Sequence, residues 1–300
     1  MKNNPSKAHH YIPVFYLENF VNSDGEFFIY KVKDGRFKMN GKPFTPKSHF
    51  FKEKGNTFEM PEMSGMSEDF LETKFYSPLD SDVAKIFQKI LNSRGEPKYG
   101  LEDKEIPHLE YFFSHLYWRN PSSDQHVKEL LEKKSLKELG IVAKGESSVV
   151  EKFEAKLKSH PDFYKFMKSM LPGSLFGNYK LALDHKFLIL EYPFNLPGIL
   201  GDNPVILKQW SHNNYVEDML VPIAKDLVFS RNRKEVKFID ANVKVLIDMM
   251  LLKQANEFVC VTDKNYIEQL EDTYNDVKIA DLENLRQLLF HGLEKDHGQI

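Results

Sequence analysis

Apolar residues change their spacing near Pro172. Before it, in segments such as 83–91, they recur every three or four residues, which is the spacing of a buried helix face. After it, they fall into short runs separated by Pro, Gly and Asn, a pattern typical of strands with short connections. A chain that keeps its helices and strands apart in this way is expected to fold as an α+β protein with antiparallel strands, and not as repeated βαβ units.

The predicted strands lie toward both ends of the chain. Alternating apolar residues at 26–32 and a turn at 33–36 predict a β-hairpin. Later apolar runs occupy residues 187–190, 205–207, 219–221, 227–229 and 258–261. We expect a mainly helical α+β fold with one small antiparallel sheet, which the N-terminal hairpin and the strands after residue 184 build together.

Capping residues and prolines set the expected helix ends. Ser67 predicts the start of a helix, and Pro78 is expected to end it. The next helix should begin at Asp80 or Ser81, and a final one near Asp240.

The helix expected between Pro107 and Pro121 carries a polar stripe. At about 100° per residue, His115 and Arg119 fall on one side of it, next to a face of apolar residues. A polar stripe beside an apolar one suits the wall of a cleft, so His115 and Arg119 are candidate site residues.

We expect one α+β domain over residues 1–300. Residues 124–171 alternate Lys and Glu around spaced apolar side chains, with breaks at Gly140, Gly145 and Pro161. This block predicts a helical subdomain or insertion at about 122–172, with a solvated outer face and no binding surface.

The net charge of the chain limits its electrostatic attraction to nucleic acid. Lys and Arg total 41 and Asp and Glu total 44, for a net charge of −3, so only a local basic patch would attract nucleic acid. Such a patch is predicted at four nearby positions, Arg231, Arg233, Lys234 and Lys237. A solvated turn beside a strand is the alternative interpretation of the same residues.

We find no secretion signal and no apolar stretch long enough for a membrane span, and the one cysteine is Cys260. We therefore expect a cytoplasmic protein without membrane contact. The motifs of dinucleotide-binding proteins, zinc proteases, α/β-hydrolases and EF-hands are absent from the sequence, which disfavours those classes.

Two histidines, His9 and His10, precede a segment dense in aromatic and aliphatic residues, 11–20, which we expect to dock into the core. Adjacent side chains on an extended chain point to opposite sides, so at most one of the two histidines can face a shared centre. A structural hydrogen bond is the alternative role for either ring.

The tetrapeptide 201–204 marks a turn at a strand boundary. Pro204 keeps Asn203 extended, and Asp202 can bond nearby amides, so a rigid turn explains the motif without chemistry. A carboxylate held on such a turn is equally a good metal ligand or general base. Both interpretations of Asp202 remain open from the sequence.

Several short motifs follow one another along the chain. They are His10-Tyr11-Ile12-Pro13, then Phe15, Tyr16, Leu17 and Phe20, then Glu72, Arg119-Asn120-Pro121, Asp202-Asn203-Pro204 and Pro222-Ile223. In this order they resemble the protein family called domain of unknown function 4238, although Val14, Asn120 and Gly201 depart from its usual residues. The resemblance spans nearly the whole chain and implies that four polar side chains lie together: His10, Glu72, Arg119 and Asp202.

A histidine, two carboxylates and an arginine suit metal-assisted phosphodiester hydrolysis, because carboxylate and imidazole bind the metal while arginine neutralises the phosphate. Our working hypothesis is a hydrolase acting on a phosphate-containing ligand, nucleic acid or nucleotide, with Mg²⁺ or Mn²⁺. Its metal ligands are His10, Glu72 and Asp202, and Arg119 stabilises the developing charge. The substrate contacts are assigned to Tyr11, Tyr16, His115, Asn203, Arg231 and Arg233.

The alternative hypothesis is a non-catalytic module that binds a nucleotide or a protein. In that case Arg119 forms a buried, structural ion pair with Glu72 or Asp202. Breaking such a pair destabilises the fold because the other charge is left buried alone.

Overall fold

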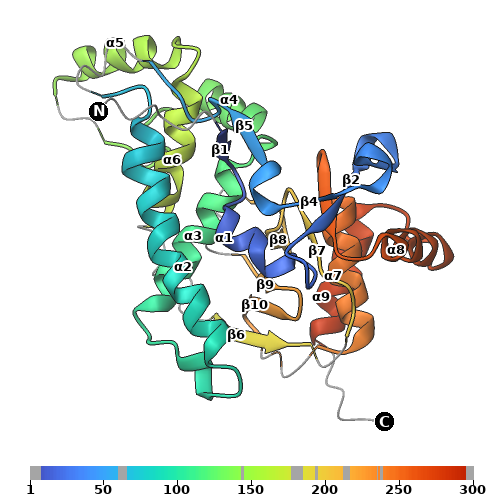
Figure 1. Ribbon diagram of the computed structural model, residues 1–300. Helices are drawn as coiled ribbons and strands as arrows, with labels where there is room; N and C mark the ends of the chain where they lie inside the picture. Colours follow the sequence, from blue (N-terminus) through green and yellow to red (C-terminus); the bar gives the residue numbers. More distant parts are fainter. Residues whose placement is uncertain are drawn as a thin grey trace, which may run out of the picture.

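The computed structural model describes residues 8–59, 66–142, 145–176, 185–192, 195–211, 217–234, 236 and 239–294. Its long helices lie in two groups on either side of the strands (Figure 1). The first group contains α2 (Ser77–Asn92), α3 (Glu105–Arg119), α4 (Ser123–Lys133), α5 (Ser147–Lys158) and α6 (Phe163–Phe176). The second contains α7 (Ala241–Lys253), α8 (Lys264–Asp276) and α9 (Leu282–Glu294), and the short α1 (Val14–Leu17) lies among the strands.

The strands of the described ranges form three antiparallel sheets, not the single sheet that was expected. The first has the order β3 (Arg36–Phe37), β2 (Phe27–Lys31), β11 (Phe258–Val261), β7 (Ile199–Gly201), with β4 (Pro43–Phe44) also paired to β2. The second has the order β6 (Lys186–Glu191), β10 (Leu227–Asn232), β9 (Met219–Ala224), β8 (Ile206–Leu207). The third pairs β1 (Ala8–His10) with β5 (Phe51–Glu53). The α+β class is therefore confirmed, whereas the single sheet was wrong because apolar periodicity identifies strands but not their partners.

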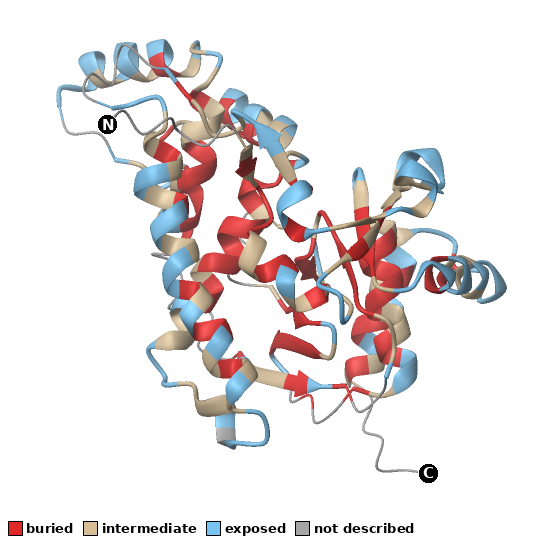
Figure 2. Ribbon diagram, viewed as in Figure 1, coloured by how far each residue is buried: buried red, intermediate tan, exposed pale blue. Residues whose placement is uncertain are grey.

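Buried residues lie on the helix faces that point toward the strands, whereas α5 and α8 are mostly exposed (Figure 2). One hydrophobic cluster joins α4 and α6 to Trp118 of α3 and to Tyr76. The block that was expected to be solvated thus has an inner face, and α6 packs directly on α3. No helix within the described ranges has both the length and the apolar character needed to cross a bilayer.

The helix break expected at Pro78 was wrong. Residues Leu71–Tyr76 form a π-helical segment that continues into α2 without interruption. Pro78 lies in the first turn of α2, where a residue without an amide hydrogen is tolerated. The continuous helix places Asp80 inside this first turn instead of at a cap.

Candidate functional site

A small polar pocket lies where β1 and β5 meet the end of α3 and helix α6. Its free volume is about 20 Å³, enough for one small chemical group and too little for a whole ligand. The charged side chains that line it are Lys52, Arg119, Asp124, Lys165 and Lys168, and the other polar ones include His9, Tyr11, Asn56, Tyr76 and Tyr164. Five segments of the chain, within residues 9–11, 52–56, 76, 119–124 and 164–168, therefore supply one site.

The guanidinium of Arg119 is buried, with 1% of the side chain exposed. Its Nε donates to the carbonyl of Tyr11 at 3.0 Å, and its Nη1 contacts both carboxylate oxygens of Asp80 at 3.1 and 3.2 Å. The rings of Tyr76 and Phe112 lie 5.3 and 6.0 Å from its central carbon. Nη2 has no hydrogen-bond partner among the described residues. A buried donor without a partner is costly, so this nitrogen favours an anion beside it.

Asp80 is the counter-ion of Arg119. Burial raises the pKa of Asp80 to about 6, although Arg119 acts to lower it. The ion pair that was expected with Glu72 or Asp202 was wrong in its partner, because the helix runs on through Pro78 and turns Asp80 toward α3. Asp80 is therefore mostly ionised at neutral pH and loses its charge as the pH falls through about 6.

Lys168 is the second buried cation of the pocket. Its Nζ donates to the backbone carbonyl of Asn120 at 2.8 Å and to the carboxylate of Asp124. Burial lowers the pKa of Lys168 to about 8, although Asp124 acts to raise it. Lys52 reaches the same carboxylate at 3.6 Å, so Asp124 serves two lysines at once.

Cations outnumber carboxylates in the described lining of the pocket. Three lysines and Arg119 face a single acidic side chain there, Asp124. Two further carboxylates, Asp80 and Asp162, pair with Arg119 and Lys165 from outside the lining. Four cations and three carboxylates leave an excess of one positive charge at this partly buried point, which suits a small anion.

Strand β1 places His9, and not His10, in the pocket. The Nδ1 of His9 accepts the backbone amide of Asn56 at 2.9 Å, so the neutral ring carries its proton on Nε2. The ring of His10 lies 5.4 Å from that of Phe51, and burial lowers its pKa. Alternation along an extended chain lets only one of two adjacent histidines face the site. The sequence analysis assigned that role to His10, whereas His9 lines the pocket.

Glu72 does not line the pocket but contacts Asn56, a residue that does. Its Oε2 accepts the side-chain amide of Asn56 at 2.9 Å, and its Oε1 lies 3.5 Å from the hydroxyl of Ser77. Glu72 therefore orients Asn56, which lines the pocket, and does not line it itself.

The carboxylate of Asp202 is bonded to the backbone at the start of β11. Its Oδ1 accepts the amide of Asn256 at 2.7 Å, and its Oδ2 accepts those of Glu257 and Phe258 at 2.8 and 3.0 Å. Burial raises the pKa of Asp202, while these amides act to lower it. The observed contacts are those of the structural turn, one of the two interpretations that the sequence left open.

Packing fixes the residues on either side of Asp202. A Cβ at Gly201 would lie 2.5 Å from the carbonyl oxygen of Leu251, so a larger residue there requires a shift of α7. The carbonyl of Asn203 accepts the side-chain amide of Gln254 at 2.5 Å. Asn203, expected to contact substrate, does not line the pocket.

No group of three or more His, Cys, Asp or Glu side chains suited to hold a metal ion occurs in the described part of the chain. The ligand set expected from the sequence, His10, Glu72 and Asp202, is therefore not assembled in this structure. The His10 ring packs on Phe51, and both Asp202 oxygens accept backbone amides.

Tyr16 and His115, two of the expected substrate contacts, belong to the core. The hydroxyl of Tyr16 donates to the carbonyl of Pro222. His115 lies between the rings of Tyr76 and Tyr111, at 5.9 and 4.6 Å, and burial lowers its pKa to about 3. Because neither side chain lines the pocket, their assignment is corrected to core packing.

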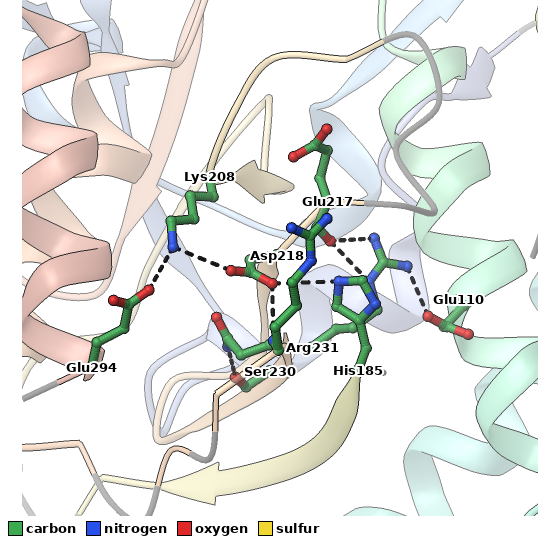
Figure 3. Close-up of polar contacts among 10 residues, drawn as sticks. Glu110, His185, Lys208, Glu217, Asp218, Ser230, Arg231 and Glu294 are labelled. Carbon is green, nitrogen blue, oxygen red and sulfur yellow. Dashed lines mark hydrogen bonds and ion pairs between the residues drawn. The ribbon is translucent and has the colours of Figure 1, made fainter. Parts of the chain in front are cut away.

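Arg231 is buried in an ion pair on the other side of α3. Its guanidinium donates to the carboxylate of Glu110 at 2.7 Å and to the carbonyl of Glu217 at 3.0 Å (Figure 3). The side chain of Glu110 is fully buried as well. Arg231 is therefore a structural residue, and its expected role as a phosphate contact is corrected.

The remaining described members of the expected basic patch, Arg233 and Lys234, lie outside the pocket lining. Arg233 is exposed and does not line the pocket, Lys234 pairs with Glu294 at 2.6 Å, and Lys237 lies outside the described residues. The phosphate contacts predicted for this segment are not assembled around Arg231.

Sequence reasoning missed the lysines of the pocket. Lys168 stands in the block that was expected to be solvated, yet its neighbours Met167 and Leu171 are buried. A lysine within the apolar stripe of a helix was the available signal. For Lys52 and Asp124 the sequence carries no comparable signal, because both lie among other charged residues.

Comparison with known proteins identifies the family of this chain. No curated protein and no solved structure matches the chain. A family model described as "Protein of unknown function (DUF4238)" matches residues 8–266, which include every residue named in the pocket lining. Because the match covers most of the chain, as the order of short motifs had suggested, this protein belongs to the DUF4238 family.

Proposed function

We propose that this protein binds a phosphate-containing ligand, a nucleotide or nucleic acid, in the pocket formed around Arg119 and Lys168. The observation that carries the proposal is the buried Arg119 guanidinium, whose Nη2 lacks a hydrogen-bond partner among the described residues. Nε and Nη1 of Arg119 already donate to Tyr11 and Asp80, so Nη2 is the part of the guanidinium left to donate to a phosphate oxygen. The three lysines around it add charge that a neutral ligand would not need.

The expected strength of the site follows from its contacts. A hydrogen bond to a charged group contributes about 1.5–3 kcal/mol, and two such contacts from buried donors, about 3–6 kcal/mol together, correspond to a Kd between about 6 mM and about 40 μM. Exposed Lys52 should contribute less, about 1 kcal/mol or a fivefold change in Kd, because water screens it.

Lys52 offers a clean test because its side chain is 56% exposed and its loss should not disturb the fold. Lys85 is a matched control, since it is 76% exposed and also paired to an aspartate, Asp82, outside the pocket. Isothermal titration with inorganic phosphate and AMP should show binding to the wild type, about fivefold weaker binding to Lys52→Ala, and unchanged binding to Lys85→Ala. Equal losses in both variants would mean nonspecific charge attraction and would contradict the proposal.

Hydrolysis of the bound phosphate ester is the second candidate, and His9 is the observation that favours it. With Nδ1 held by the amide of Asn56, the His9 ring can use only Nε2 for proton transfer to or from a group in the pocket. The Nε2–H of a ring fixed in this way can serve as the proton donor of a general acid.

Release of nitrophenolate from nitrophenyl phosphate and bis(nitrophenyl) phosphate tests this candidate with EDTA, Mg²⁺ or Mn²⁺ present. A hydrolase should turn over at least one substrate, and His9→Gln should lose turnover while it still binds phosphate. Phosphate binding without turnover under any of the three conditions would leave the non-catalytic binding module as the function.

A further inference from the structure

We infer that this pocket selects a terminal phosphomonoester and excludes the internal phosphodiesters of a nucleic acid chain. The inference rests on the proposed function and specifies which kind of phosphate is bound.

The cations of the pocket are graded by depth. The side chain of Arg119 is 1% exposed, that of Lys168 8%, and that of Lys52 56%. A ligand can reach Lys52 from the surface, but its oxygens must enter the pocket to reach Arg119 and Lys168. A ligand therefore reaches the two buried cations only if its phosphate group fits inside the pocket.

The size of the pocket limits what can enter. Its free volume of about 20 Å³ suits one tetrahedral group and little else. A phosphomonoester has one substituent, which can leave through the mouth while three oxygens point inward. A phosphodiester has two substituents, and both would have to fit beside the buried cations or leave by the same opening. The diester therefore cannot place its oxygens as deeply.

The donors still available match three oxygens. Each lysine ammonium has three N–H groups. Lys168 uses two of them on Asn120 and Asp124, and Lys165 uses two on the carbonyl of Thr57 and on Asp162. Among the described residues, this leaves one N–H on each lysine in addition to Nη2 of Arg119. Three separate donor groups thus line a pocket with room for one phosphoryl group.

The rest of the ligand stays outside the pocket. Tyr164 lines it as a partly buried residue, and the ammonium of Lys128 lies 4.5 Å from the centre of its ring. Because no room is left inside for a sugar or base, the pocket recognises the phosphate end itself. A free nucleotide and the phosphorylated end of a nucleic acid strand share that chemistry.

Three small anions test whether the pocket selects its ligand by shape or by charge. Phenyl phosphate is a monoester, methyl phenyl phosphate is a diester with a single charge, and phenyl sulfate has a single charge but three unsubstituted oxygens. We expect phenyl phosphate to bind at least about tenfold more tightly than the diester, and phenyl sulfate to bind more tightly than the diester as well.

Each result of this titration has a distinct meaning. Equal binding of the diester and phenyl phosphate would overturn the inference and leave the proposed function standing. Equal binding of phenyl sulfate and the diester would also overturn it, because charge alone would then explain the preference. If none of the three anions binds, the proposed function fails, and the inference fails with it.

Two oligonucleotides and AMP distinguish the sources of the phosphate end. A single strand with a 5′-phosphate should bind, and the same strand with a 5′-hydroxyl should not, although both carry identical internal diesters. Binding of AMP alone would identify a free nucleotide as the source and support the inference. Equal binding of both strands would overturn it.

Variants at two depths complete the test. Lys52→Ala, at the mouth, should weaken all three small anions by a similar factor and keep the monoester preference within about twofold. Lys168→Met should reduce that preference, provided that its melting curve shows a folded protein. Loss of the preference in Lys52→Ala would place selection at the surface and contradict the inference.

Discussion

The side-chain amide of Asn120 donates a hydrogen bond to the backbone carbonyl of Asp202. The backbone carbonyl of Asn120 in turn accepts the ammonium of Lys168 at 2.8 Å. One residue thereby connects the Asp-Asn-Pro turn to a cation of the pocket. Asp202 supports the site through the position of its backbone, while its carboxylate fixes the turn against β11.

Asp202→Asn should destabilise the protein. The carboxylate accepts three backbone amides, and an asparagine would point N–H donors at one or two of them. We expect a loss of about 2–3 kcal/mol in the free energy of unfolding, measured by urea denaturation. Phosphate affinity of the folded fraction should change less than about threefold, because the Asp202 carboxylate does not line the pocket.

Asp263→Asn is the matched control for this change. Asp263 caps α8 through a single amide, that of Asn265, and asparagine caps a helix about as well as aspartate. Its free energy of unfolding should change by less than about 0.5 kcal/mol. An Asp202→Asn variant as stable as this control would contradict the structural role of Asp202.

Sulfate binding should strengthen as the pH falls. Sulfate keeps two negative charges throughout, so any change reflects the protein. Lys168, with a pKa of about 8, gains its positive charge as the pH falls through that value. Asp80, with a pKa raised to about 6, then loses its negative charge beside Arg119 at lower pH. Titrations from about pH 9 to about pH 5 should show two steps, each of about five- to tenfold in affinity.

The Asp80→Asn variant tests whether Asp80 causes the rise in sulfate affinity near pH 6. This variant is neutral at every pH, so its sulfate affinity should be raised already at neutral pH and should not rise further near pH 6. Glu72 and His10 are the other groups whose charges act in this cluster, and both remain in the variant. A lower step that persists in Asp80→Asn would contradict its assignment to Asp80.

Much of the fold follows from local pattern. The strand expected at 258–261 is confirmed by β11, and the helix expected near Asp240 is confirmed by α7, whose cap Asp240 accepts the amide of Val243. The error at Pro78 came from a π-helical segment, which leaves no distinct sequence pattern. Helices α8 and α9 were not expected, although apolar residues recur at helical spacing in both, as Leu285, Leu289 and Leu293 do in α9.

The site was harder to predict than the fold. Arg119 was placed among the candidate residues from its helical stripe, and it lines the pocket. The choice between His9 and His10 depended on which face of β1 turns inward, and this is decided by its pairing with β5. The role of Asp202 depended on whether backbone amides reach its oxygens, and those amides lie more than fifty residues away along the chain. Such contacts are tertiary and leave no local signal.

Glu110→Gln should destabilise the protein strongly. Glu110 and Arg231 form an ion pair with 0% and 1% of their side chains exposed, so the variant removes a carboxylate charge from beside a buried guanidinium. We expect a loss of about 3–5 kcal/mol in urea denaturation. Glu283→Gln is the control, because Glu283 is 59% exposed in its pair with Arg286 and should cost under about 1 kcal/mol. Similar costs for the two variants would contradict a structural role for the buried pair.

Diffraction from a crystal soaked in tungstate locates a bound tetrahedral anion directly, through its anomalous signal. The account predicts a peak in the pocket, with an anion oxygen about 2.8 Å from Nη2 of Arg119 and from Nζ of Lys168. A soaked crystal with tungstate at other surface lysines and none beside Arg119 would contradict it.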